Sequence, residues 1–216
     1  QIPGNDFEVL LHIGTLCSIL LVFNNDIKNI LFTLSSKETQ RFILMIFVGT
    51  IPAVIIGLGF KDEIEKLFDN IIVVGFALLF TGLTLISSFY LKNENKKNTI
   101  IKACLIGIAQ AIAIIPGISR SGITISFALF LGLDARQAAK FSFLLAIPVI
   151  SGAGILMAID LRDGFSLDMY TGISGLLTSF FVGVVALKWS LAWLEGGKFH
   201  YFGIYCFLIG ILIIIT

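Results

Sequence analysis

Six stretches of about 20 mostly apolar residues constrain the fold of this chain more than any other feature. A helix of that length can cross the hydrocarbon core of a bilayer. With 57% hydrophobic and 13% charged residues, a water-soluble domain would expose apolar surface that it could not bury. We therefore predict an all-α polytopic membrane protein with six transmembrane helices, over residues 7–23, 41–60, 71–90, 141–159, 172–194 and 199–216.

Two shorter apolar segments lie between the third and fourth of these stretches. They cover residues 100–115 and 122–133 and are joined by a polar turn at 116–121. Each is short for a span, so we predict a re-entrant helical hairpin over residues 100–133. Its tip would be buried in protein, where irregular backbone is tolerated at membrane depth. Asp134 and Gln137 have the spacing of a capping box and predict the start of the next helix.

A weak internal repeat indicates how the spans are arranged. Phe7 and Phe141 stand in similar short sequences, and each opens a series of three spans. An odd number of spans per repeat inverts the second copy in the membrane. We therefore predict a single membrane domain, residues 1–216, with repeats at 7–98 and 99–216, the second carrying the hairpin. By the same symmetry we expect a first hairpin upstream of Gln1, missing from this chain.

The polar turn carries the residues that bear most directly on function. It reads Pro116-Gly117-Ile118-Ser119-Arg120-Ser121-Gly122-Ile123-Thr124. An arginine at membrane depth is costly and in most cases serves a function. Because a guanidinium offers two parallel N–H donors that match two phosphate oxygens, we assign Arg120 to a substrate phosphate and to catalysis. The alternative is a structural role in which Arg120 bonds helix-end carbonyls.

Neighbours of Arg120 add donors to this candidate phosphate site. Gly117 and Gly122 let the backbone approach an anion closely, and the second half of the hairpin begins there with free N–H groups. Ser119, Ser121 and Thr124 add hydroxyl groups. We assign Ser119 a catalytic role and the other four residues to substrate binding. No base lies near Ser119 in the sequence, which argues against a covalent serine intermediate.

Three polar residues in the apolar segments each have two interpretations. Gln110 is a further substrate-binding candidate, although its apolar surroundings favour an interhelical hydrogen bond. Glu8 and His12 are four residues apart and so share one helix face. They form either a proton-handling or metal-binding pair or, as we favour, groups held in interfacial hydrogen bonds.

Taken together, these residues resemble the undecaprenyl-pyrophosphate phosphatase (bacitracin-resistance) family. The resemblance rests on the turn at 116–124, with Gln110 before it and residues 139–148 after it, and extends over essentially the whole chain. It implies hydrolysis of undecaprenyl pyrophosphate to undecaprenyl phosphate and phosphate, which recycles the lipid carrier of peptidoglycan synthesis and gives bacitracin resistance. It also implies a divalent cation, Mg²⁺ or Ca²⁺, and a place in the lipid bilayer of the bacterial plasma membrane.

The chain departs from the family pattern at a second motif. The resemblance implies a Glu-x-x-x-Glu pair followed by a serine and a histidine in the first hairpin, and this sequence has none of the four. The family also has a glutamine where His12 stands. We therefore expect no metal ligands in this chain and an incomplete site, and the sequence leaves open whether the chain is active as it stands. Two alternatives stay open: a polyprenyl-phosphate transporter or flippase, because inverted repeats with broken helices are common in transporters, and a non-catalytic paralogue.

Other function classes lack support in the sequence. It contains no G-x-x-x-x-G-K-[ST], no His-Glu-x-x-His and no cysteine–histidine cluster. Type-2 phosphatidic-acid phosphatases share the Ser119-Arg120 pair but place a histidine soon after the arginine, whereas the histidines here are His12 and His200. A net charge of +1 gives no indication of a nucleic-acid partner, and we expect none. The sequence leaves open whether the chain forms a homodimer.

Overall fold

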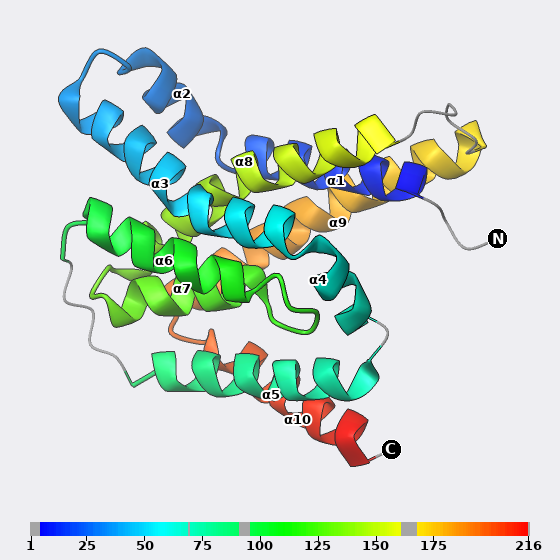
Figure 1. The fold of residues 1–216 in the computed structure, drawn as a ribbon. Helices are drawn as coiled ribbons and strands as arrows, with labels where there is room; N and C mark the ends of the chain where they lie inside the picture. Colours follow the sequence, from blue (N-terminus) through cyan, green and yellow to red (C-terminus); the bar gives the residue numbers. More distant parts are fainter. Residues whose placement is uncertain (1–4, 69, 91–95, 161–167, 216) are drawn as a thin grey trace. The chain divides into compact units, whose positions relative to one another are not determined.

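A computed structural model describes residues 5–68, 70–90, 96–160 and 168–215, and within these residues every regular element is a helix (Figure 1). The prediction of an all-α fold is therefore confirmed. The helices are α1 (Asn5–Val22), α2 (Asn24–Phe32), α3 (Lys37–Gly59), α4 (Lys61–Phe68), α5 (Ile71–Ser88), α6 (Ile100–Ile112), α7 (Arg120–Phe130), α8 (Ala135–Asp160), α9 (Met169–Glu195) and α10 (His200–Ile215).

A helix lies over each of the six predicted spans. Four of them, α3, α5, α8 and α9, are long and apolar enough to cross a membrane, by length and composition. The bent pair α1 and α2, with 72° between its axes, adds a fifth if it counts as one span. The sixth predicted span corresponds to α10, which is apolar but only 16 residues long. The chain is thus a multi-pass membrane protein.

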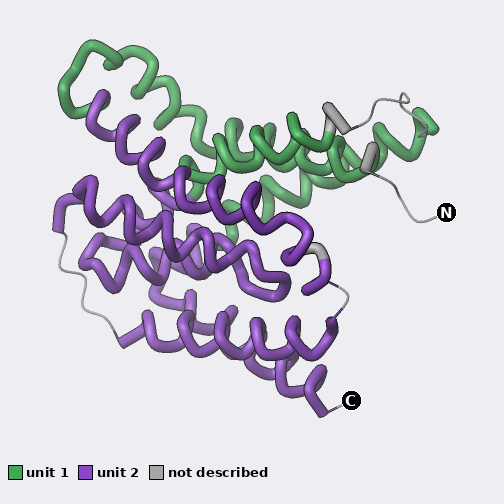
Figure 2. The backbone as a smooth tube through the Cα atoms, viewed as in Figure 1, with its two compact units in different colours: residues 1–39, 143–190 green, residues 40–142, 191–216 purple. Residues whose placement is uncertain are grey.

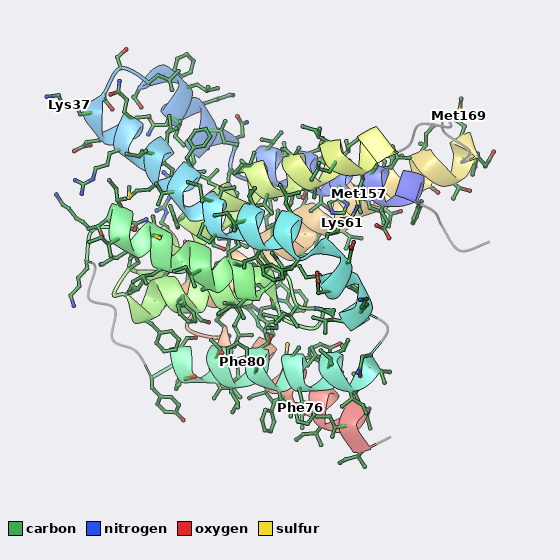
Figure 3. All side chains as sticks on the ribbon, in the orientation of Figure 1. Lys37, Lys61, Phe76, Phe80, Met157 and Met169 are labelled. Carbon is green, nitrogen blue, oxygen red and sulfur yellow. The ribbon has the colours of Figure 1, made fainter. Side chains whose placement is uncertain are left out.

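Large apolar side chains cover the outer faces of these helices. Phe76 and Phe80 of α5, for example, are 59% and 43% exposed (Figure 3). In water such a surface would drive aggregation, but in a bilayer the lipid tails cover it. The exposed aromatic and aliphatic side chains therefore agree with a chain surrounded by lipid.

The chain divides into two compact units that interleave along the sequence (Figure 2). Unit 1 holds residues 1–39 and 143–190, and unit 2 holds residues 40–142 and 191–216. In unit 1, α1 packs on α9, since a Cβ added at Gly183 would lie 2.6 Å from the Ser18 hydroxyl. The predicted repeats, 7–98 and 99–216, follow a different division and stay a prediction.

The firmest helix pair of unit 2 joins α5 to α10 through glycines. Gly75 lies against Gly210, and Gly82 lies against Gly203, so the two helices run antiparallel. A Cβ added at Gly82 would lie 2.7 Å from the Gly203 carbonyl oxygen, and one added at Gly203 would lie 2.8 Å from that of Gly82. Small residues allow such close backbone contact, which stabilises helix pairs in membranes by van der Waals packing.

The predicted helical hairpin is present in unit 2 as α6 and α7, which pack against each other (Figure 1). Its re-entrant placement in the membrane stays a prediction. Helix α6 ends at Ile112, three residues before the predicted end, and α7 begins at Arg120, two residues before the predicted start. The predicted cap after the hairpin is confirmed, because Asp134 accepts a hydrogen bond of 2.8 Å from the Gln137 N–H. Helix α8 accordingly begins at Ala135, earlier than the predicted span.

We expect Gly82→Ala to lower the thermal unfolding temperature of the detergent-solubilised protein, because the added methyl group would collide with the Gly203 carbonyl. Overpacking of this kind costs about 1–3 kcal/mol. Gly152→Ala is the matched control, since a Cβ there has nothing within 4 Å. Equal unfolding temperatures for the two variants would contradict this account of the helix pair.

Candidate functional site

The turn between α6 and α7 lies against α5 at Gly117. Gly117 has φ +92°, a conformation that side chains disfavour. A Cβ there would also lie 2.6 Å from the Val74 carbonyl oxygen and 2.9 Å from the Ala77 Cβ. The structure shows that this glycine lets the turn approach the backbone of α5. The predicted close approach of its backbone to an anion stays a prediction.

Thr81 of α5 joins this turn through two hydrogen bonds. Its hydroxyl accepts a bond of 3.1 Å from the Ser119 N–H and donates one of 3.3 Å to the Gly117 carbonyl. The side chain is fully buried. Two peptide groups of this irregular turn are thus paired by a single side chain. Such pairing is required wherever irregular backbone lies in a membrane.

Ser119 is the N-cap residue of α7. Its side-chain oxygen accepts a bond of 3.2 Å from the Gly122 N–H, and its carbonyl accepts one of 2.9 Å from the Ile123 N–H. Gly122 leaves room for this cap, because a Cβ there would lie 2.9 Å from the Ser119 hydroxyl oxygen. None of the described residues places a carboxylate or an imidazole in a hydrogen bond with Ser119. Its capping role is observed, and its catalytic role stays a prediction.

Within the described part of the chain, the first two N–H groups of α7 have no hydrogen-bond acceptor. Among the described residues, none accepts a hydrogen bond from the N–H of Arg120 or of Ser121. The Ser121 hydroxyl likewise has no partner in this part of the chain, and its side chain is half-buried. Unpaired N–H groups at a helix N-terminus are a favourable position for an anion. Ser121 is therefore the hydroxyl that remains available to a phosphate.

The Arg120 guanidinium is held by two protein acceptors. Nη1 donates a bond of 3.1 Å to the Ser142 carbonyl of α8, and Nη2 donates to the Gln110 Oε1 of α6. The Nε–H is buried and has no acceptor among the described residues. A buried, unpaired charged donor is expensive, and one such group in a well-paired surrounding indicates a missing acceptor. Neither acceptor is a helix-end carbonyl, because Ser142 lies within α8 and Gln110 contributes a side-chain oxygen.

Gln110 forms the interhelical hydrogen bond that its surroundings favoured. Its Oε1 accepts from Arg120, and its Nε2 donates a bond of 3.4 Å to the Gly49 carbonyl of α3. The side chain is 2% exposed. Because both ends of the carboxamide are used inside the protein, the geometry favours orientation of Arg120 over direct contact with a substrate.

Thr124 bonds the backbone of Arg120 and the side chain of Ser142. Its hydroxyl donates a bond of 2.9 Å to the Arg120 carbonyl and lies 2.5 Å from the Ser142 hydroxyl. Both hydroxyl-bearing side chains are fully buried. The Thr124 hydroxyl thus holds Ser142, the residue that supplies an acceptor to the guanidinium. Its expected contact with a substrate stays a prediction.

Two residues of this arrangement were missed by sequence reasoning. Ser142 stands in the segment that carries the family resemblance, but no spacing rule connects it with Arg120. Thr81 stands in an apolar helix outside any motif. A hydroxyl in a membrane helix is a weak signal, because it usually bonds a carbonyl of its own helix.

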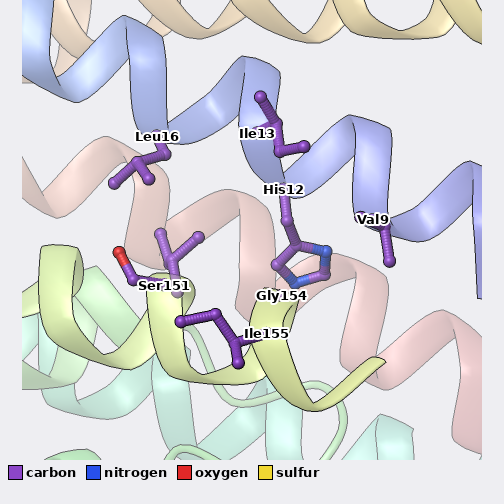
Figure 4. A pocket seen from close by; sticks show the side chains of 8 residues that line it. Val9, His12, Ile13, Leu16, Ser151, Gly154 and Ile155 are labelled. Carbon is purple, nitrogen blue, oxygen red and sulfur yellow. The ribbon is translucent and has the colours of Figure 1, made fainter. Parts of the chain in front are cut away.

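The other polar pair lies in unit 1. His12 Nδ1 is 2.7 Å from the backbone oxygen of Glu8, so the ring bonds the helix and not the carboxylate. His12 borders an apolar pocket between α1 and α8 (Figure 4), of about 340 Å³, lined by Val9, His12, Ile13, Leu16, Ile150, Ser151, Gly154 and Ile155. This geometry favours the hydrogen-bonding interpretation over a metal-binding pair.

The described residues contain no group of three or more histidine, cysteine, aspartate or glutamate side chains that could hold a metal ion. They therefore supply no ligand set for the predicted divalent cation. That cofactor stays a prediction.

Comparison with known proteins gives a consistent result. The family model described as "Bacitracin resistance protein BacA" matches residues 1–212. The undecaprenyl-diphosphatase of Christiangramia forsetii is 41% identical over 97% of this chain and 81% of that protein. Those of Halothermothrix orenii and Carboxydothermus hydrogenoformans are 42% and 39% identical, over 96% and 97% of this chain and 82% and 81% of those proteins.

We expect Ser119→Ala to increase hydrogen exchange at the first turn of α7, because the Gly122 N–H loses its acceptor. Loss of an N-cap costs about 1 kcal/mol, or roughly fivefold in the opening equilibrium. Exchange of the peptide that covers residues 119–130, followed by mass spectrometry, measures this effect. Ser121→Ala should leave the exchange unchanged, and a similar increase in both variants would argue against the cap.

Proposed function

The chain belongs to the bacitracin resistance protein BacA family, and on that premise we propose that it is an undecaprenyl-diphosphatase. Relatives of about 40% identity are named undecaprenyl-diphosphatase, and this chain aligns with most of their length. The proposed reaction converts undecaprenyl pyrophosphate into undecaprenyl phosphate and inorganic phosphate. We place the protein in the bacterial plasma membrane, where this reaction returns the lipid carrier to peptidoglycan synthesis and lowers sensitivity to bacitracin.

The observation that carries the proposal is the group of unpaired donors around Arg120. The buried Nε–H of Arg120 and the N–H groups of Arg120 and Ser121 all lie at the N-terminus of α7. A diphosphate brings the acceptors that these donors lack, and charge-assisted bonds to phosphate oxygens are strong in surroundings of low dielectric constant. The re-entrant hairpin therefore presents a diphosphate-binding surface inside a membrane protein.

The chemistry requires stabilisation of negative charge. Water attacks the terminal phosphorus, the bond from this phosphorus to the bridging oxygen breaks, and undecaprenyl phosphate leaves with that oxygen. The attacking water loses its proton to solvent as inorganic phosphate forms. Charge spreads over the non-bridging oxygens in the transition state, so donors fixed beforehand at those positions lower the barrier. Arg120 is the donor that carries a full charge, and Gln110 and Ser142 hold it in place.

Arg120→Ala should reduce phosphate release from undecaprenyl pyrophosphate in detergent by about 10²–10³-fold, the usual loss when a charge-stabilising donor is removed. Arg120→Lys should recover little of it, because lysine keeps the charge but not the two parallel donors. The exposed Arg136 offers the matched control Arg136→Lys, which should leave release unchanged. Undiminished turnover in Arg120→Ala would refute the proposed role.

We also propose that a divalent cation, Mg²⁺ or Ca²⁺, accompanies the substrate, since diphosphate oxygens are preferred ligands of hard cations. When bound, it would neutralise part of the diphosphate charge. We expect EDTA to abolish phosphate release and either cation to restore it in the same assay. Release that persists in EDTA would contradict a cation requirement.

A further inference from the structure

We infer that Thr81 is a positioning residue that holds the substrate-binding turn on α5 and thereby orients Arg120. The inference rests on the proposed function, because it assigns a role in the proposed phosphatase site. It concerns a residue outside the 116–124 segment, on a different helix. Three features of the structure support it: the direction of its hydrogen bonds, the packing around it and the place of the turn in the chain.

The first observation is the partner of the Thr81 hydroxyl. Threonine in a helix usually donates its hydroxyl to the carbonyl four residues earlier. Thr84, on the same helix, does so with a bond of 2.8 Å to the Phe80 carbonyl. Thr81 instead donates to Gly117, 36 residues further along the chain, and accepts from Ser119. Its hydrogen-bonding groups are thus directed into the turn.

The second observation is that one face of α5 is shaped to receive the turn. Val74, Ala77, Thr81 and Leu85 recur at intervals of three or four residues and so lie on one side of the helix. Gly117 approaches Val74 and Ala77, and a Cβ at Gly122 would lie 3.4 Å from Leu85. Thr81 is therefore the polar residue between two apolar contact points.

The third observation is the position of Arg120 directly after residues 117–119, the segment that the two Thr81 hydrogen bonds hold. We call these two bonds the Thr81 clamp. The two bonds of Thr81 fix the Gly117 carbonyl and the Ser119 N–H, on either side of Ile118. Ser119 caps α7, and Arg120 is the next residue. A change in the Ser119 backbone would therefore move the guanidinium and the first N–H groups of α7 together. Misplacement of a reacting group by about 1 Å can cost on the order of 100-fold in rate.

The clamp should affect turnover more than substrate affinity. The long polyprenyl chain contributes apolar contacts that do not depend on Thr81, whereas alignment of the donors matters most in the transition state. Thr81→Val keeps the shape of the side chain but leaves one N–H and one carbonyl without a partner. We expect kcat to fall about 10- to 100-fold and KM to change by less than about threefold.

The experiment compares kcat and KM for wild type, Thr81→Val, Thr81→Ser and Thr84→Val, each per amount of monodisperse, folded protein. Thr81→Ser keeps the hydroxyl and should restore kcat to within about threefold of wild type. Thr84→Val removes a buried hydroxyl of the same helix that bonds only within the helix, and should behave as wild type. If Thr81→Val does not fold, Thr81→Ala replaces it in the experiment. It also removes the hydroxyl, but it does not place a branched apolar side chain against the polar turn.

Two results would overturn the inference. One is a Thr81→Val enzyme as active as Thr84→Val, and the other is a Thr81→Ser enzyme as impaired as Thr81→Val, which would show that packing and not the hydroxyl matters. If wild type releases no phosphate, the proposed function fails, and equilibrium dialysis with inorganic pyrophosphate tests the clamp instead. Weaker binding in Thr81→Val than in Thr84→Val and Thr81→Ser then supports it, whereas equal binding, or none in wild type, overturns it.

Discussion

A charged guanidinium and an irregular turn within a membrane protein set the main requirement on this structure. In hydrocarbon, every polar group must be paired inside the protein. Two nitrogens of the Arg120 side chain are paired with Ser142 and Gln110. Backbone groups of the turn are paired with the side chains of Thr81 and Ser119. Among the described residues, the donors left over at this site are the Arg120 Nε–H and the backbone N–H groups of Arg120 and Ser121. A diphosphate site requires such an arrangement, in which most polar groups are hydrogen-bonded within the protein and a few donors stay available for the phosphate oxygens.

Helix α5 supports this arrangement on two of its faces. Glycines 75 and 82 bring it into backbone contact with α10, while Thr81 and its apolar neighbours receive the turn. A site with donors that must be aligned to a fraction of an ångström benefits from such a rigid base. The hairpin itself is short, so its position depends on the helices around it more than on its own hydrogen bonds.

Much of the fold could be predicted from patterns in the sequence. The apolar stretches located a helix at each predicted span, and the interruption at 116–121 located the hairpin. The ends were less accurate, because a cap depends on one side chain: Ser119 starts α7 two residues early, and Asp134 starts α8 before the apolar run. The bend of 72° after α1 was not foreseen: the predicted span ended at Phe23, where Asn24, Asn25 and Asp26 interrupt the apolar run, and no helix was predicted directly after it.

The sequence by itself determined the membrane class, the hairpin and the choice of Arg120, because burial of a guanidinium is too costly to occur without a purpose. Only the tertiary structure decided what each neighbour does. In the structure Ser119 is a helix cap, Gln110 is a bridge to α3 and Thr124 is a buried support. Of these three roles, the sequence indicated only the interhelical bond of Gln110. The role of Thr81 could not be identified from the sequence, because a hydrogen bond between residues 36 positions apart forms only when the helices pack.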